Sequence, residues 1–288
     1  MGDKVKLAAA QINPLITAKR ENLEKIVSAA RMASGNKSDL IVFPECALTG
    51  YMFSNRDEAL PYAETIPGPS TETLSALCRE MGVYIVYGLL EKAGAALYNS
   101  AALIGPGGLI GRYRKNHLPF LGIDRFLDAG NEPFRVYETS IGKIGLFICY
   151  DCNFPESARV MALSGADILA LPTNWPEGRS MIPEHVITVR AFENKVHLIA
   201  ADRVGEERGA RFIGCSKIIN AKGETLSAAS ADKEEIIYGE VNLADARQKR
   251  TIIKAGEFEA DFIHDRRPEL YEKIIEKMQK GTANKRSI

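Results

Sequence analysis

The sequence has no apolar run long enough to cross a membrane, and its opening residues, MGDKVKLAAAQ, bring charges where a secretion signal is apolar. It also has no net charge, because 37 basic side chains balance 37 acidic ones. A neutral chain has no overall field to draw it onto nucleic acid or an anionic membrane. We therefore expect a cytoplasmic protein with no nucleic-acid or membrane partner, acting on a small molecule.

Cysteines are few, and the glycines of a nucleotide-binding loop are missing. Five cysteines in 288 residues do not form the dense, even-numbered framework of a small secreted domain, so reduced thiols are expected. The turn from Gly105 to Gly108 fails the dinucleotide fingerprint, because Ile110 stands where a third glycine is required. The same turn lies between two apolar runs and predicts a hairpin.

No repeat, low-complexity tract or long linker divides the chain, and a hydrophobic content of 45% is enough for a large core. We expect one domain over residues 1–288. Short runs rich in Val, Ile and Leu alternate with helical patterns, which indicates an α/β fold with sheets covered by helices. Strands are expected at 6–12, 40–44, 83–90, 100–105, 143–149, 167–171, 197–201, 212–220 and 236–241, and helices at 17–33, 70–81, 155–164, 182–194 and 268–280.

Three reactive side chains stand where predicted strands end. Glu45 ends the run LIVFPE, Lys115 ends GLIGRYRK, and Cys149 ends the apolar part of IGLFICYD. Residues just beyond strand ends line the crevice where ligands bind to such sheets, so the three are expected to converge. A carboxylate takes the proton of a thiol, and an ammonium stabilises the negative charge that develops, so the set suits hydrolysis.

Each residue alone has a simpler interpretation, and other chemistries stay open. A cysteine at the end of a buried strand is usually a small hydrophobe, and a lysine in a basic stretch is usually solvated. Cys149 and Cys152 form a CxxC pair, which is typical of redox or metal sites, but the sequence lacks a second half for a zinc cluster. Two alternatives remain: a protease with His117 or His197 as base, and an assembly scaffold.

The combination of motifs resembles a known family. FPECALTGY, YRKNHLP and CYDCNFPESAR are similar, in order and spacing, to the Glu, Lys and Cys motifs of the nitrilase-like carbon-nitrogen hydrolase superfamily. The resemblance continues through GADILALPTNWP, RAFENKVHLIAADRVG, FIGCSKIINAKGE and DRRPELY, and covers Val5 to Tyr271. It implies a four-layer αββα sandwich, a triad of Glu45, Lys115 and Cys149, a thioester intermediate, and no metal or organic cofactor.

The resemblance also implies an assembly. Members pair through the helices on the nucleophile side into homodimers or higher homo-oligomers. Residues 245–288, which contain the DRRP motif, are therefore expected to form a C-terminal extension that packs on a partner subunit.

A fourth acidic residue assists the triad in this superfamily, 25 residues before the nucleophile, and that position is Asp124 here. Aspartate replaces the usual glutamate and is one methylene shorter. Glu132 is a weaker candidate for the same role. Asp202 is a second departure, because relatives mostly carry asparagine at this position.

The residues after the nucleophile indicate the reaction. Nitrile-cleaving members usually read Cys-Trp-Glu, whereas Cys149-Tyr150-Asp151 looks like the amidase branch. We expect hydrolysis of a small linear amide, omega-amides of dicarboxylic acids first, with Arg179 and Arg203 as carboxylate partners. Carbamoyl compounds and nitriles are the alternatives. The residues expected to contact the substrate follow the three motifs and the strand DILALPT: Tyr51, Phe120, Tyr150, Asn174 and Trp175.

Overall fold

The structure, a computed structural model, describes residues 4–277 and divides the chain into two compact units. The first unit ends at Gln248 and contains the two large sheets and the helices that cover them. The second begins at Lys249 and contains the hairpin β15–β16 and two short helices. The second unit lies within the expected C-terminal extension, residues 245–288.

The first unit is built on two six-stranded sheets. Strands β1, β2 and β3 run parallel in the first sheet, and β7, β8 and β9 run parallel in the second. The first sheet has the order β14 (Glu235–Asn242), β1 (Lys4–Gln11), β2 (Leu40–Val42), β3 (Tyr84–Ala93), β4 (Ala96–Gly105), β5 (Gly108–Arg114). The second has the order β13 (Thr225–Ala228), β12 (Lys217–Ile219), β9 (His197–Asp202), β8 (Ile168–Thr173), β7 (Gly142–Leu146), β6 (Val136–Thr139).

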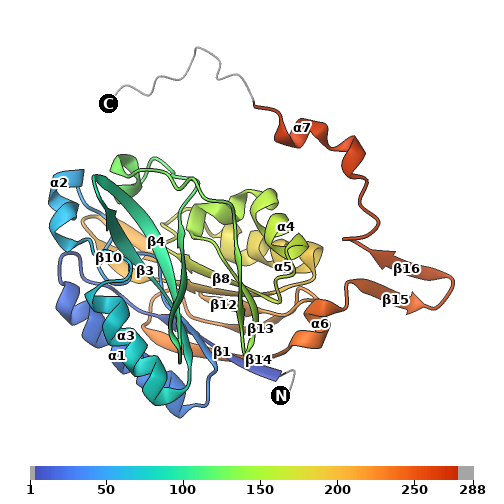
Figure 1. Cartoon of the computed structure of the whole chain (residues 1–288), viewed down its shortest axis with the longest axis horizontal. Coiled ribbons are helices and arrows are strands. Elements are labelled where there is room, and N and C mark those ends of the chain that lie inside the picture. The colour runs from blue at the N-terminus through green and yellow to red at the C-terminus, as the bar shows by residue number, and fades with distance from the viewer. Residues whose placement is uncertain (1–3, 278–288) are drawn as a thin grey trace. The chain divides into compact units, whose positions relative to one another are not determined.

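Helices cover the outer face of each sheet. Figure 1 shows α1 (Lys19–Gly35) and α3 (Pro69–Met81) on one side, and α4 (Pro155–Leu163) and α5 (Ile187–Asn194) on the other. The expected α/β class and the layered sandwich are confirmed. The smaller helices are α2 (Arg56–Ala59), η1 (Leu60–Tyr62), η2 (Gly122–Phe126), η3 (Cys149–Asn153), η4 (Ile182–Val186) and α6 (Leu243–Arg247).

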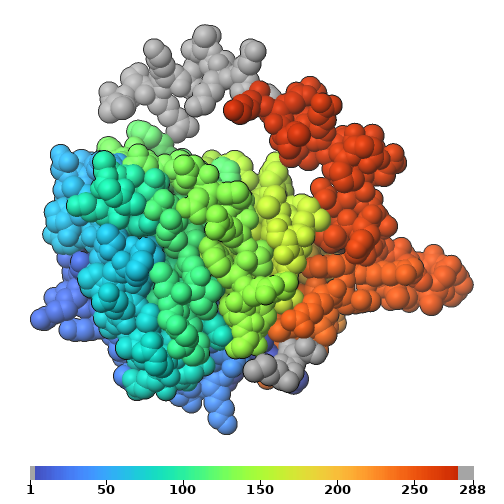
Figure 2. All heavy atoms as spheres, viewed as in Figure 1, coloured from blue at the N-terminus to red at the C-terminus, as the bar shows by residue number. Residues whose placement is uncertain are grey.

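The period of two in β1 shows how the layers are held together. Leu7 and Ala9 point to the core between the sheets, whereas Ala8 and Ala10 pack under α1 and α3. Both faces are buried, because parallel sheets of this kind are covered on both sides. On the face shown in Figure 2, the N-terminal segments (blue and cyan) pack directly against segments from the middle of the chain (green and yellow-green).

Some predicted boundaries are wrong for identifiable reasons. The strand expected at 212–220 is interrupted, because Gly214 and Cys215 take positive φ values of 59° and 60°. Its first part, β11 (Ala210–Ile213), pairs with β10 (Val204–Glu207) in a separate hairpin, and only its second part joins the sheet as β12.

The two remaining helical predictions hold only in part. The helix expected at 182–194 begins with the π turn η4 before α5. Within 268–280, the described part forms the short helices η5 (Pro268–Leu270) and α7 (Glu272–Ile275), and positions 278–280 lie outside the described residues. The second unit also contains β15 (Arg250–Lys254) and β16 (Phe258–Asp261).

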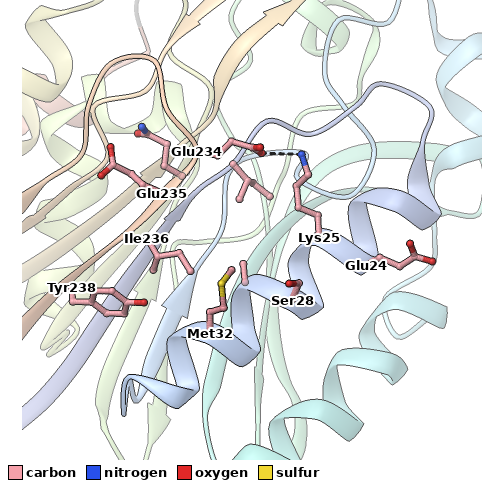
Figure 3. A pocket seen from close by; sticks show the side chains of 11 residues that line it. Glu24, Lys25, Ser28, Met32, Glu234, Glu235, Ile236 and Tyr238 are labelled. Atoms are coloured by element: carbon pink, nitrogen blue, oxygen red, sulfur yellow. Dashed lines mark hydrogen bonds and ion pairs between the residues drawn. The ribbon is translucent and has the colours of Figure 1, made fainter.

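A pocket of about 690 Å³ lies between α1 and β14. Figure 3 shows Met32, Ile236 and Tyr238 along its apolar side, and the ion pair of Lys25 with Glu234, at 2.8 Å, across its other end. None of the three predicted triad residues lines this pocket. Within residues 4–277, the helices are all too short or too polar to cross a membrane.

Candidate active site

Glu45 lies in a tight turn after β2, in which Cys46 has a left-handed backbone with φ of 49°. Gly88 on β3 lets this turn approach the sheet, because a Cβ there would lie 2.4 Å from the Cys46 nitrogen. The N–H of Gly88 donates to the Pro44 carbonyl at 3.1 Å, and the Leu48 N–H donates to the Gly88 carbonyl at 3.2 Å. The turn is thus fixed to the sheet and holds Glu45 fully buried.

Lys115 directly follows β5, and its side chain is also fully buried. Its Nζ lies 2.6 Å from Glu45 Oε1 and 2.5 Å from Asp124 Oδ2. Asp124, in η2, also accepts a hydrogen bond of 2.9 Å from the Tyr51 hydroxyl. An ammonium has three N–H donors, so the two carboxylates leave one of them for another acceptor.

Cys149 begins η3, just beyond β7, and has a φ of 42°, which is uncommon for a residue other than glycine. Asp151 stabilises this turn. Its Oδ2 accepts the Ile148 N–H and the Tyr113 hydroxyl, both at 2.9 Å, and its Oδ1 lies 2.7 Å from Nδ1 of His117. The strained residue is therefore held by several hydrogen bonds to a buried carboxylate.

Burial and neighbouring charges set the protonation states. Burial raises the pKa of Glu45, although Lys115 acts against this. Burial and the charge of Glu45 hold the pKa of the Cys149 thiol well above its usual value, while Lys115, the Thr173 hydroxyl and the Asn174 N–H act to lower it. Burial would lower the pKa of Lys115, but Asp124 and Glu45 outweigh it and keep the amine charged.

The ends of β8 and β9 form another wall of the site. Thr173 and Asp202 are register partners, and Asp202 Oδ1 accepts the N–H groups of Trp175 and Arg203, both at 2.9 Å. Among residues 4–277, Asp202 Oδ2, Trp175 Nε1 and both polar atoms of the Asn174 amide are buried without a hydrogen-bond partner. Buried polar atoms are normally paired, so this wall presents groups that a ligand can satisfy.

The predicted substrate-contacting aromatic residues lie in different surroundings. Tyr51 is buried and bound to Asp124, beside Lys115 rather than open to solvent. Tyr150 is half-buried, with Phe154 edge-on at a ring distance of 5.2 Å. Phe120 lies at the surface with 56% of its side chain exposed.

Two other expected site residues are engaged elsewhere. Glu132 binds Arg112 at 2.9 Å and is only partly buried, so Asp124, not Glu132, is the acidic residue beside Lys115. Arg203 forms a buried ion pair of 2.7 Å with Glu207, which removes it as a partner for a substrate carboxylate. Arg179 is exposed.

His197 does not offer a base of the protease kind, and His117 has no hydrogen bond to Cys149 among residues 4–277. Both ring nitrogens of His197 bind backbone groups, the Ala221 N–H at 3.1 Å and the Asn242 carbonyl at 2.9 Å. His117 binds Asp151 and stacks on Phe154 with a ring distance of 3.8 Å. The part of the chain described here contains no cluster of three His, Cys, Asp or Glu residues suited to a metal ion.

Sequence reasoning missed Asn99, which lies on β4 inside the apolar run around ALYNSAALIG. Its Nδ2 donates to Glu45 Oε1 at 2.6 Å and to Asp124 Oδ1 at 2.9 Å. The available signal was a single amide within an otherwise apolar strand, where a polar side chain needs buried partners.

The chain is similar to several known proteins over most of its length. Residues 6–251 match the family model for carbon-nitrogen hydrolases. A nitrilase of Pyrococcus abyssi is 44% identical over 93% of this chain and 99% of its own, and an omega-amidase NIT2 of Danio rerio is 31% identical over 87% and 94%. The crystal structure of a carbon-nitrogen hydrolase from Helicobacter pylori G27 superimposes with a TM-score of 0.83 at 27% identity, over 96% of this chain and 99% of the other.

Proposed function

Because the chain belongs to the carbon-nitrogen hydrolase family, we propose that it cleaves the carbon-nitrogen bond of a small linear amide and releases a carboxylic acid and ammonia. The observation that carries this proposal is the buried Lys115, held between Glu45 and Asp124, with the charges of Glu45 and Lys115 both acting on the Cys149 thiol. Thiol, base and fixed positive charge are the groups that acyl transfer needs.

In the first half of the reaction, Glu45 takes the proton of the Cys149 thiol and the sulfur attacks the amide carbonyl. The free N–H of Lys115 and a backbone N–H beyond Cys149 hold the oxyanion, and each such donor typically stabilises the transition state by about 3 kcal/mol. Glu45 then returns the proton to the departing nitrogen. Ammonia leaves, and an acyl thioester remains on Cys149.

In the second half, Glu45 removes a proton from water, which attacks the thioester carbonyl. The same two donors hold the second oxyanion, and the proton goes back to the sulfur as the acid leaves. One carboxylate thus acts as base twice and as acid twice, which suits a group whose pKa is raised by burial.

The amide is preferred because Tyr150 and Asp151 follow the nucleophile, as in the amidase branch that the sequence resembles. The omega-amidase among the relatives supports this choice. A nitrile is the second candidate, because the relative with 44% identity is named a nitrilase. A carbamoyl compound is the third, since its carbonyl presents the same carbon-nitrogen bond to the thiol.

The test is ammonia release from short aliphatic amides, omega-amides, carbamoyl amino acids and nitriles. We expect wild type and Cys152→Ala to release ammonia from an amide, and Cys149→Ala to lose about 10³-fold or more. Cys152 is a matched control, because it is a buried cysteine three residues from the nucleophile. Folded wild type that cleaves only nitriles, or nothing in the panel, would contradict the proposal.

A further inference from the structure

Asn99 connects the two carboxylates that flank Lys115. Its Nδ2 donates to Glu45 Oε1 at 2.6 Å and to Asp124 Oδ1 at 2.9 Å, while Lys115 Nζ joins the same two carboxylates from the other side. The four side chains form a closed ring of hydrogen bonds. All of them are buried.

The orientation of the Asn99 amide is determined by its partners. Ionised carboxylates only accept hydrogen bonds, so the amide nitrogen must face Glu45 and Asp124. Its oxygen then accepts the thiol of Cys46 at 3.6 Å, and the Asn99 backbone carbonyl accepts the Lys115 N–H at 2.8 Å. Asn99 therefore contacts both carboxylates and the backbone of the lysine.

In this ring, the two carboxylate oxygens of Glu45 differ in their hydrogen bonds. Oε1 accepts from both Lys115 and Asn99, whereas Oε2 is buried and has no hydrogen-bond partner within residues 4–277. A proton added to Glu45 goes to the oxygen that carries no donors. Oε2 is thus the oxygen left to exchange a proton with the thiol.

We infer that Asn99 is a positioning residue for the hydrolysis: by binding Oε1, it fixes the rotation of the Glu45 carboxylate, so that Oε2 serves as the base. The inference rests on the proposed role of Glu45 as base. Asn99 acts through Glu45 and Asp124 and not directly on the Cys149 thiol.

Several titratable groups act on Glu45, and the Asn99 hydrogen bond adds to their effects. They are Lys115 after β5, Asp124 in η2, Cys149 after β7, Asp202 at the end of β9, and Cys46 and Tyr51 in the loop of Glu45 itself. Removing the Asn99 N–H takes a hydrogen-bond donor away from the ionised carboxylate of Glu45, which raises the pKa of Glu45 further.

The experiment measures alkylation of Cys149 by iodoacetamide against pH, followed by mass spectrometry of the Cys149 peptide. The thiol proton passes to Glu45, the sulfur bonds to the methylene carbon, and iodide leaves with the carbon-iodine electrons. This reaction needs no knowledge of the natural substrate, so it stays informative even if the amide panel fails. The variants are Asn99→Leu, close in shape but without donors, and Asn99→Ser, whose short side chain cannot reach both carboxylates.

The matched control is Ser100→Ala. Ser100 is the next residue on β4, also buried, and donates one hydrogen bond of 2.7 Å to Glu91. Consecutive strand residues point to opposite faces, so this change removes a buried hydrogen bond on the face away from Glu45.

We expect Asn99→Leu to alkylate about tenfold more slowly than wild type at pH 7, with the midpoint of its pH profile moved upward and Ser100→Ala unchanged. If Asn99→Leu does not fold, Asn99→Ser decides by the same two readings. The inference is overturned if the variant alkylates at the same rate as Ser100→Ala. It is also overturned if alkylation slows but the midpoint of the pH profile does not move, because a residue with a merely structural role would give that result.

Discussion

Burial determines the charge states on which this site depends. A buried thiol stays protonated near neutrality, and the negative charge of Glu45 strengthens this effect, so the proposed reaction requires a base to turn Cys149 into a nucleophile. Lys115 stays charged in the same surroundings because two carboxylates flank it. The three residues therefore form one coupled unit, and no member acts with the pKa of an isolated side chain.

Asp202 is a buried carboxyl group with one oxygen unpaired among the described residues. Because burial raises its folded-state pKa above the unfolded value of about 3.9, it is protonated in both states well below pH 4 and opposes folding only at higher pH. We expect Asp202→Asn to be more stable than wild type by about 1–2 kcal/mol at pH 8. Its amide keeps the oxygen that accepts the Trp175 and Arg203 N–H groups.

The measurement is urea unfolding of wild type and Asp202→Asn at pH 8 and at pH 4.5. The sign follows from proton uptake: the native state holds the Asp202 proton to higher pH, so wild-type stability falls as pH rises past the unfolded pKa. The difference between the proteins should shrink at pH 4.5. A difference of equal size at both values would show that ionisation is not its cause.

Glu207, the last residue of β10, forms a buried ion pair and joins the hairpin β10–β11 to the loop of Glu45. Glu207 binds Arg203 at 2.7 Å, and its second oxygen accepts the N–H groups of Tyr51 and Met52 at 2.8 and 2.6 Å. Glu207→Ala leaves a buried guanidinium unpaired, so we expect a loss of about 3–5 kcal/mol in unfolding free energy. Chemical denaturation measures it.

Two further variants separate the possible sources of that loss. Adding Arg203→Met to Glu207→Ala should recover part of the stability, because no unpaired charge then remains. Glu58→Gln, which breaks the more exposed pair with Arg208 in the same region, should cost much less. A Glu207→Ala protein as stable as Glu58→Gln would contradict the structural role of the buried pair.

The sequence predicts the elements with uniform patterns and misses those without one. The strand ends at Glu45 and Cys149 are visible because each closes an apolar run, whereas Lys115 closes the basic stretch of GLIGRYRK. The short strands β6, β10 and β13 are partly exposed, so no alternation or apolar run distinguishes them. The interruption at Gly214 depends on backbone angles that composition alone does not reveal.

The residues of the candidate site also differ in whether the sequence identifies them. Glu45, Lys115 and Cys149 carry recognisable motifs, so the resemblance identifies them before any coordinates. Asn99 has no motif of its own, and the Cys motif contains Asp151 without revealing its role, because their hydrogen-bond partners are 25 to 54 and 3 to 38 residues away in sequence. The contact of Asp151 with Tyr113 forms only once the two sheets have packed together, because Tyr113 lies on β5 and Asp151 follows β7.

The outer surfaces of α4 and α5 expose apolar side chains of the first unit. Val160 and Leu163 on α4 are 42% and 47% exposed, and Val189 on α5 is 46% exposed. A stable protein-protein interface buries about 1,600 Å² in total and has an apolar centre, which these helices can supply. We therefore expect the 31.6-kDa chain to form a homodimer or a larger assembly through them.

Sedimentation velocity over a range of concentrations tests this expectation. Wild type should sediment as a dimer or larger, and the double variant Leu163→Asp with Val189→Asp should shift to monomer, because two buried charges face each other across a symmetric interface. Leu15→Asp is the control, since Leu15 is also exposed, at 51%, but lies outside these helices. A monomeric wild type would show that the chain does not assemble. A double variant that assembles like wild type would show that the interface lies outside α4 and α5.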